Sequence, residues 1–577
     1  MIYARQLPFG ATLLDSDRVR FRLWAPKQRR VDVLLGDDDK PVPMRRDEQG
    51  WFEAEAKCGP GGRYRYRLGD GLTVPDPAAR AQLGGVHGES VIVDPVSYAW
   101  QHADWRGRPW HEVVLYELHA GLFGGFEGVQ ARLQPLVDVG VTAIELMPIA
   151  DFPGKRNWGY DGVLPFAPAC CYGEPDELKA LIDAAHGLGL MVFLDVVYNH
   201  FGPDGNYLGA YAPSFFREDI HTPWGAAIDF RQPDVRRFFI ENALMWLMEY
   251  RFDGLRFDAV HEIAEQDFLL EMAQEIRRTV EPGRHVHLVL ENDANSARLL
   301  QPGAFNAQWN DDAHHALHVL LTGEREGYYV DHAGHPADRL ARCLAEGFDY
   351  QGEVSVHRGG KPRGERSGDL PPTSFVFYVE NHDQVGNRAF GDRLITRVDG
   401  DALRAAIALQ LLCPHIPLIF MGEEQGSTLP FQFFTDHHGA LAKAVREGRR
   451  REFAGIAHVA EEEIPDPNAL QTYESGRLSR EAPKPQWLDY YRRLLSLRHE
   501  IIVPLLPGMK SLGAATLSNE AVLARWRSGN AVLSLAINLG NQPCVLPSLR
   551  GKQIFTSNPG SEHGHLAPRC TVAYLKR

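Results

Sequence analysis

Three segments of the chain combine a β-strand pattern with a carboxylate at or just beyond the C-terminal end. Apolar and charged residues alternate in 254–260, so Arg256 and Asp258 fall on the same strand face. Glu291 follows a short apolar run, and Asp383 follows a longer one. Charged groups that point into a sheet interior are costly unless they pair or react. Barrel enzymes gather their reactive residues from the ends of separate strands.

Carboxylates placed on both sides of one bond are typical of glycoside cleavage. An ionised carboxylate attacks the anomeric carbon, and a protonated carboxyl gives its proton to the departing oxygen. The alternative is that Asp258, Glu291 and Asp383 cap helices or pair with Arg256. That alternative would be favoured for any one of them alone. All three in chain order, with histidines at similar strand ends, favour catalysis instead.

Four motifs resemble the signature regions of the α-amylase superfamily, glycoside hydrolase family 13: residues 195–200, residues 254–261, Glu291 and residues 381–383. The resemblance spans most of the chain. It implies that Asp258 is the nucleophile, Glu291 the general acid/base and Asp383 the group that stabilises the transition state. It also implies a set of residues that bind sugar around the cleavage point: Tyr160, Asn199, His200, Arg256, His382 and Gln384.

Within the superfamily, the chain is most similar to hydrolases that release trehalose from maltooligosaccharides ending in a trehalose unit. Residues 156–160, 201–207, 309–318 and 321–329 carry this likeness. It implies a retaining hydrolase that cuts the α-1,4 bond beside the trehalose unit. Polar and aromatic loops would line the trehalose pocket, and we expect the following residues there: His261, Glu262, Trp309, Asp311 and Asp312.

Two departures from these relatives concern residues outside the reacting groups. Gln425 stands where the relatives usually have a tryptophan, and Asn292 follows the acid where a serine is more common. Two other functions also remain open. A glycogen-branching transferase would use the same three carboxylates, and a glucan-binding protein with an inactive barrel would use none of them. Products from branched, linear and trehalose-capped glucans would separate the three.

Composition places the chain among ordinary globular proteins and narrows its partners. It has 577 residues, 44% of them hydrophobic and 24% charged. A net charge of −14 argues against nucleic acid or an anionic membrane as a partner and suits a neutral α-glucan. The first residues lack an apolar signal segment, and no run is long enough to cross a membrane. The seven scattered cysteines indicate reduced thiols, so we expect a cytoplasmic protein.

The hydrophobic pattern predicts a multidomain α/β protein. Residues 1–95 alternate in strands without an amphipathic helix, which indicates an N-terminal β-sandwich. Strands alternate with helical stretches in 96–505, which indicates a catalytic (β/α)₈ TIM barrel. Residues 506–577 are again rich in strands and predict a C-terminal β-sandwich. We expect residues 313–373 to form an excursion over the site.

The barrel strands are predicted at eight places along the chain: near 113–119, 142–148, 190–198, 254–260, 287–291, 304–309, 374–380 and 417–421.

Several histidines could suggest a metal site. His314 and His318 lie four residues apart on a predicted helix, a spacing that zinc sites use. No acid or cysteine completes a recognisable set around them. Asn199 and nearby acids are reminiscent of the calcium site of many amylases, but the loop after His200 is too short to supply a full oxygen cage. We therefore expect neither a required metal nor a cofactor.

Overall fold

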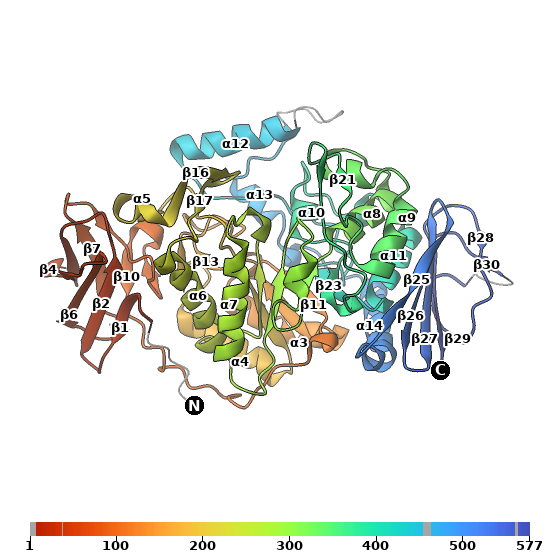
Figure 1. Ribbon diagram of the computed structural model, residues 1–577, viewed down its shortest axis with the longest axis horizontal. Coiled ribbons are helices and arrows are strands. Elements are labelled where there is room, and N and C mark those ends of the chain that lie inside the picture. The colour runs from red at the N-terminus through yellow and green to blue at the C-terminus, as the bar shows by residue number, and fades with distance from the viewer. Residues whose placement is uncertain (1–6, 37, 454–462, 560–563) are drawn as a thin grey trace.

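The computed structural model describes residues 7–36, 38–453, 463–559 and 564–577. Its elements form three parts, with β-sheets at either end of a central barrel (Figure 1). This arrangement confirms the predicted fold class. Among the described residues, none of the helices has both the length and the apolar composition needed to cross a membrane.

The central part is a closed barrel of eight parallel strands. All eight predicted strands are present, most of them shorter than expected. The barrel strands are, in order around the ring, β11 (Leu115–Leu118), β12 (Ala143–Leu146), β15 (Met191–Val196), β18 (Gly254–Phe257), β19 (His287–Leu290), β20 (Ala307–Trp309), β23 (Phe375–Phe377) and β24 (Ile416–Phe420).

Every residue of these eight strands is buried, because helices cover the outside of the barrel and side chains fill its inside. The crossover helices begin with recognisable signals. In α4 (Pro175–Gly187), Glu174 and Glu177 form a reciprocal capping box, and Pro175 occupies the first turn. The other main helices around the barrel are α3 (Leu133–Val139), α6 (Pro233–Met248), α7 (Gln266–Thr279), α8 (Asp311–Thr322), α11 (Gly400–Leu412) and α14 (Pro485–Leu497).

The N-terminal part packs two antiparallel sheets around a shared apolar core. One sheet has the order β1 (Gly10–Leu13), β2 (Arg18–Trp24), β6 (Trp51–Lys57) and β5 (Arg45–Arg46). The other has the order β4 (Lys40–Pro43), β3 (Val31–Leu35), β7 (Arg63–Leu68), β10 (Glu89–Val91) and β9 (Gln82–Leu83), and β8 (Thr73–Val74) pairs with β7. The short 3₁₀ turn at Gly85–His87 lies close to the barrel loops, because the His87 ring bonds the Tyr207 hydroxyl at 2.7 Å.

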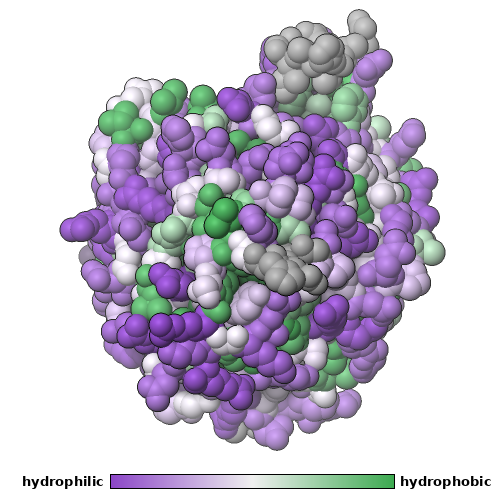
Figure 2. Space-filling model, turned by 90° about the vertical axis from the view of Figure 1, so that its right-hand side faces the viewer, coloured by the Kyte–Doolittle hydropathy of each residue, from purple (hydrophilic) through white to green (hydrophobic). Residues whose placement is uncertain are grey.

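The C-terminal part is a five-stranded antiparallel sheet backed by a small two-stranded one. A separate apolar cluster lies between them. Hydrophilic residues dominate the outer face at this end of the molecule, with hydrophobic residues in smaller areas between them (Figure 2). The strands of the large sheet are β25 (Lys510–Ser518), β26 (Ala521–Ser528), β27 (Ala531–Asn538), β31 (Cys570–Lys576) and β29 (Lys552–Thr556).

The segment 313–373 differs from the expected excursion. Two helices, α8 and α9 (Pro336–Glu346), account for 21 of its 61 residues. Helix α9 packs against β25 and β26, and Trp526 donates a hydrogen bond to the Leu344 carbonyl at 3.2 Å. Its apolar face therefore joins the barrel to the C-terminal sheet, and only parts of the segment reach the site.

Candidate active site

A cavity of about 510 Å³ opens at the C-terminal end of the barrel strands. Asp258, Glu291 and Asp383, which together span 125 positions of the chain, all line it. The structure thus brings together the three carboxylates predicted to react. The other predicted residues that line the cavity are Tyr160, His200, His261, Trp309, Asp311, His382 and Gln384.

Asp258 is held from below by two fully buried side chains. Arg256 donates to Asp258 Oδ1 at 2.7 Å, and the Asn199 amide donates to Oδ2 at 2.9 Å. Burial alone would raise the pKa of the Asp258 carboxyl, but Arg256, His200 and the Asn199 hydrogen bond outweigh it, and the pKa lies below its usual value. Asp258 is therefore ionised at neutral pH, as a nucleophile must be.

Glu291 has the opposite electrostatic environment. Burial raises its pKa to about 8; the charge of Arg256 opposes this rise, and the charges of Asp258 and Asp383 add to it. The Ala259 amide donates to Glu291 Oε2 at 2.5 Å, while Arg256 Nη2 is 3.8 Å from the same oxygen. Ala259 has a left-handed backbone (φ +40°), which turns the chain directly after Asp258. Glu291 is thus held beside the nucleophile in its protonated form.

Beside Asp383, His382 connects the pocket to the barrel interior. Its Nε2 lies 2.8 Å from the Tyr160 hydroxyl and 3.4 Å from Asp383 Oδ2. Its backbone amide donates to Glu117 Oε2 at 2.9 Å, and its Nδ1 lies 2.5 Å from Oε1. Burial lowers the pKa of His382, but the charges of Asp383 and Glu117 outweigh it and raise the pKa to about 9. Glu117 therefore holds a cationic histidine at the pocket floor.

A further acid, Glu145, lies below this layer on β12. Neither of its carboxyl oxygens has a hydrogen-bond partner among the described residues. Burial, together with the charges of Glu117 and Asp195, raises the pKa of Glu145 well above its usual value. Glu145 is consequently neutral, which limits the negative charge stacked beneath the pocket.

Four residues predicted to bind sugar do not line the cavity. Arg256 and Asn199 are fully buried one layer below and contact Asp258 instead. Glu262 is not among the residues that line it, and its carboxylate lies 3.9 Å from the His261 ring. Asp312 does not line the cavity either, because its carboxylate is completely buried.

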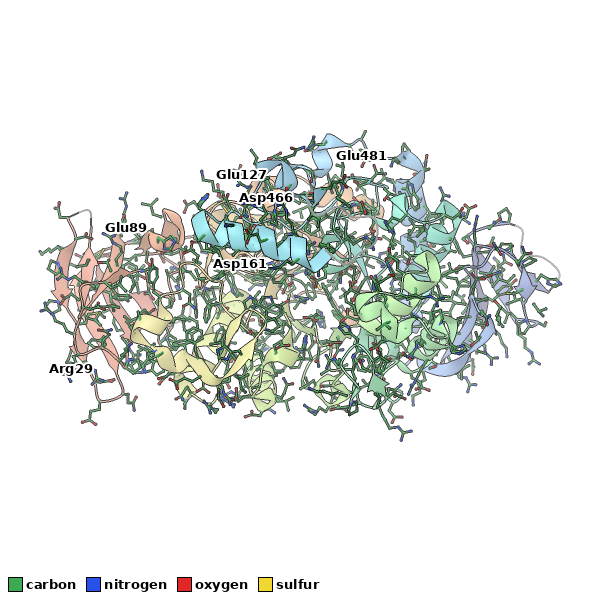
Figure 3. All side chains as sticks on the ribbon, turned by 90° about the horizontal axis from the view of Figure 1, so that it is seen from above. Arg29, Glu89, Glu127, Asp161, Asp466 and Glu481 are labelled. Atoms are coloured by element: carbon green, nitrogen blue, oxygen red, sulfur yellow. The ribbon has the colours of Figure 1, made fainter. Side chains whose placement is uncertain are left out.

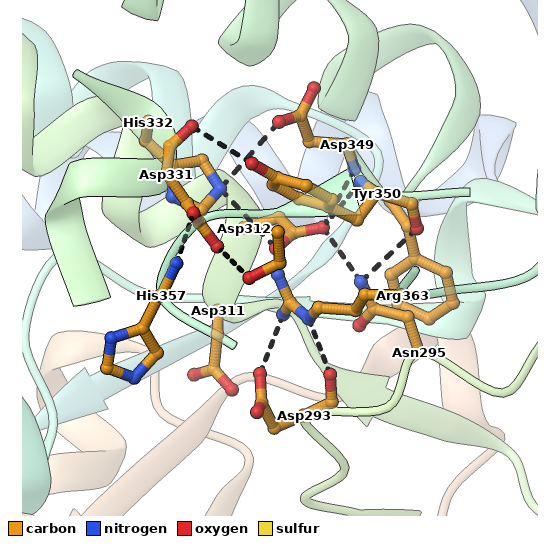
Figure 4. Close-up of polar contacts among 12 residues, drawn as sticks. Asp293, Asn295, Asp311, Asp312, Asp331, His332, Asp349, Tyr350, His357 and Arg363 are labelled. Carbon is orange, nitrogen blue, oxygen red and sulfur yellow. Dashed lines mark hydrogen bonds and ion pairs between the residues drawn. The ribbon is translucent and has the colours of Figure 1, made fainter. Parts of the chain in front are cut away.

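Asp312 lies at the centre of a cluster of polar residues that supply hydrogen-bond donors to both of its carboxylate oxygens (Figure 4). Arg363 donates to its Oδ1 at 2.7 Å, and Asn295 donates to its Oδ2 at 2.8 Å. The backbone amides of Asp349 and Tyr350 donate to the same Oδ2. This cluster holds the 349–363 connection against the barrel. The connection carries His357, which lines the cavity.

The comparisons with known proteins agree with this geometry. The description "Alpha amylase, catalytic domain" matches residues 91–214, "Carbohydrate-binding module 48 (Isoamylase N-terminal domain)" matches 8–96, and a domain of unknown function matches 510–574. The malto-oligosyltrehalose trehalohydrolase of Deinococcus radiodurans is 44% identical, over 85% of this chain and 83% of the relative. The chain belongs to the malto-oligosyltrehalose trehalohydrolase family.

A crystal structure of a candidate alpha amylase from Salmonella typhimurium superposes on this member of the trehalohydrolase family with a TM-score of 0.95. It is 45% identical and covers 99% of this chain and 100% of its own. By contrast, the similarity to a 1,4-alpha-glucan branching enzyme from Ralstonia nicotianae, at 35% identity, covers only 44% of this chain and 37% of that enzyme. The trehalohydrolase resemblance is therefore the more complete one.

The pocket of this trehalohydrolase-family chain has two halves, set by the order of strands around the barrel. Loops that follow β18, β19 and β20 form the half that contains Glu291, and loops that follow β23, β24, β12 and β15 form the half around Tyr160. The residues on the Glu291 side are His261, Asp293, Asp311, His315, Tyr328 and His357. Those on the Tyr160 side are Trp158, His200, Trp224, His382, Asn387 and Phe433.

Sequence reasoning missed several residues of the site. Tyr328 and His357 come from the long connection before β23, where no strand-end spacing marks them. Glu117 did leave a signal, because a carboxylate within the buried strand β11 needs a partner. Trp224 stacks on the His200 ring with centroids 4.7 Å apart and also lines the cavity.

Among the described residues, histidine, cysteine and acidic side chains form no group of three or more that could hold a metal ion. His314 stacks on Tyr378, and His318 stacks on Tyr329, with centroids 5.2 and 4.2 Å apart. Burial lowers the pKa of both rings, so they are neutral and packed in an aromatic cluster.

Proposed function

We propose that this chain is a retaining glycoside hydrolase. It cleaves the α-1,4 bond beside the terminal trehalose unit of maltooligosyltrehalose and releases trehalose. The family membership supports the substrate, and the paired carboxyls support the chemistry. The observation that carries the mechanism is the opposite tuning of two neighbouring acids. Asp258 has a lowered pKa and Glu291 a pKa of about 8.

In the proposed first step, ionised Asp258 attacks the anomeric carbon and forms a covalent glycosyl-enzyme. The bond from that carbon to the leaving oxygen breaks, and Glu291 donates its proton to the oxygen. In the second step, ionised Glu291 takes a proton from water, whose oxygen displaces Asp258. Asp383 and cationic His382 hold ring hydroxyls while positive charge develops on the sugar.

From the position of Glu291 we infer which part of the substrate each half of the pocket holds. The leaving group lies on the side of the acid that protonates it, so the trehalose unit occupies the half lined by His261, Asp293 and His357. The sugar that becomes attached to Asp258 lies on the Tyr160 side, and the maltooligosaccharide extends from there. Arg358 and Arg363 both pair with Asp293, which fixes its carboxylate for trehalose hydroxyls.

We also infer that the protein works in a reducing compartment such as the cytoplasm. All seven cysteines are free thiols, including the adjacent Cys170 and Cys171. Reduced cysteines at this number are typical of cytoplasmic proteins.

Product analysis on a trehalose-capped maltooligosaccharide tests the function. We expect free trehalose and a shortened maltooligosaccharide whose new reducing end first appears as the α anomer in a proton NMR time course. The β anomer as first product would contradict the retaining mechanism. New α-1,6 branches without free trehalose would indicate the branching transferase, and binding without any product would indicate an inactive glucan-binding protein.

A further inference from the structure

A second and larger cavity, of about 1260 Å³, lies outside the pocket that holds the three carboxylates. Three regions of the protein form it together. The N-terminal part contributes the turn at 84–87, the barrel contributes loops at 121–125, 153–156 and 170–172, and residues in 436–441 and 470–477 line the remaining side. In the view from above, helix α12 (Gly439–Phe453), which contributes to this side, crosses the middle of the molecule (Figure 3).

This cavity adjoins the Tyr160 half of the active-site pocket. Arg156 lines the large cavity, and Trp158, two residues later, lines the pocket. His437 lines the large cavity, and its ring lies 3.3 Å from the Asp161 carboxylate, next to Tyr160. The loops after β24, β11 and β12 form most of its barrel side, opposite the half that contains Glu291. The cavity therefore lies on the side where the non-leaving part of the substrate extends.

The side chains that line the large cavity carry equal numbers of positive and negative charges. Three cationic side chains line it together with three carboxylates: Lys155, Arg156 and Arg477 with Asp204, Asp436 and Glu474. Arg156 pairs with Asp436, and Arg477 pairs with Glu474 at 2.9 Å. Because the cationic and anionic side chains are equal in number, and two pairs of them are in direct contact, the lining has no excess charge that would select an anion or a cation. A neutral, polar ligand fits this lining.

The lining also offers what a sugar needs. The Lys155 side chain is exposed and lines the cavity, so its ammonium group can donate to a ligand hydroxyl. A Cβ built on Gly85 or Gly124 would meet no heavy atom within 4 Å, so the backbone faces open space there. Leu470 is 56% exposed on the short helix α13 (Leu470–Glu474) and supplies an apolar surface. A sugar can direct its hydroxyls to the polar groups and the open backbone, and it can place a C–H face against Leu470.

We propose that this cavity is a second α-glucan-binding site, which holds glucose units of the maltooligosaccharide remote from the cleaved bond. The inference rests on the proposed function, because it assigns the cavity to the same substrate. It predicts that the enzyme binds long capped chains more tightly than short ones, and that this preference resides in the cavity.

Leu470→Arg places a long charged side chain in the cavity, and Lys155→Met removes a donor at nearly constant length. Their matched controls are Leu72→Arg, at a position 40% exposed, and Lys57→Met, both in the N-terminal part and away from the cavity. We expect KM for maltoheptaosyltrehalose to rise about fivefold in the cavity variants with kcat unchanged, because uniform binding is lost. KM for maltosyltrehalose should not change, and the controls should match the wild type.

Unchanged KM for the long substrate, or an equal rise for both substrates, would overturn the inference. Continued trehalose release from maltosyltrehalose would leave the proposed function standing in either case. A separate readout uses the thiols Cys170 and Cys171, which line the cavity. In the full-length Glu291→Gln protein, maltoheptaose should slow their alkylation by iodoacetamide several-fold without protecting Cys544 in β28 (Cys544–Val545). Equal alkylation with and without maltoheptaose would count against the site.

Discussion

Two groups of carboxylates near the barrel mouth show how the same residue types serve catalysis in one place and structure in another. In the active-site pocket, burial and neighbouring charges raise the pKa of Glu291 to about 8, while Asp258 is ionised. In the cluster around Asp312, burial would raise the pKa of that carboxyl, but Arg363 and His332 outweigh it and lower the pKa far below its usual value. Only the active-site group combines an ionised carboxylate, Asp258, with a neighbouring carboxyl, Glu291, that is protonated at neutral pH.

The difference lies in hydrogen-bond donors. Asp312 accepts from one guanidinium, one amide side chain and two backbone amides, and it is completely buried. Glu291 accepts from the Ala259 amide and faces the cavity. A carboxylate whose donors satisfy it has little capacity to exchange a proton, whereas one with few donors and nearby negative charge has that capacity. The number of donors separates the two roles where residue type does not.

The largest expected effect is the loss of trehalose release when Glu291 or Asp258 is replaced. Glu291→Gln imitates the neutral form that the raised pKa favours, so the fold should be unchanged while the proton donor is lost. Asp258→Asn removes the nucleophile. General acid–base catalysis contributes about 10²–10⁴ in rate, and we expect a loss of at least that size in both variants. Steady-state trehalose release measures it, and more than about a tenth of wild-type turnover in either variant would contradict the assignment.

A substitution in the cluster around Asp312 should lower the stability of the fold and leave the activity intact, which is the opposite of a substitution in the pocket. Asp312→Asn leaves Arg363 without a buried partner charge, and removing one member of a buried ion pair costs about 3–5 kcal/mol. We expect a clearly lower thermal unfolding midpoint, with trehalose release retained well below that temperature. Circular dichroism and activity measured on the same samples check this, and Glu291→Gln serves as the control with an unchanged midpoint. An Asp312→Asn protein that is stable but inactive would show that the cluster takes part in catalysis.

Sequence patterns predicted the barrel and its eight strands, and they placed three carboxylates at strand ends that the structure brings to one cavity, because strand period and strand ends are local properties. They did not predict which of these side chains would line the cavity and which would lie buried beneath it. Arg256 and Asp258 share a strand face, but Arg256 lies one layer lower and does not line the cavity. Asp311 and Asp312 are adjacent at the start of α8, so their side chains point in different directions. One lines the pocket and the other is buried in the scaffold, a distinction that only tertiary packing determines.

The dependence of kcat/KM on pH should show a more moderate effect of the difference between Glu291 and Asp312. Glu291 must be protonated to donate, so the active fraction of enzyme falls as pH rises through its pKa of about 8. We expect kcat/KM to fall about tenfold per pH unit above that value. Asp312 is ionised throughout this range and should leave the unfolding midpoint unaffected there. A flat profile up to pH 10 would show that another group donates the proton.

The smallest expected effect concerns metal ions. Clustered carboxylates in enzymes are often neutralised by calcium, which takes six to eight oxygen ligands. Here the buried Asp312 cluster is neutralised by a guanidinium, since Arg363 lies within 3 Å of both Asp293 and Asp312. Directly beneath the pocket, Arg256 lies within 3 Å of both Asp258 and Asp195. Prolonged dialysis against EDTA should therefore change neither trehalose release nor the unfolding midpoint by more than the error of the measurement. A loss of activity that calcium restores would locate an ion in the catalytic group, and a lowered midpoint with intact activity would locate one elsewhere in the fold.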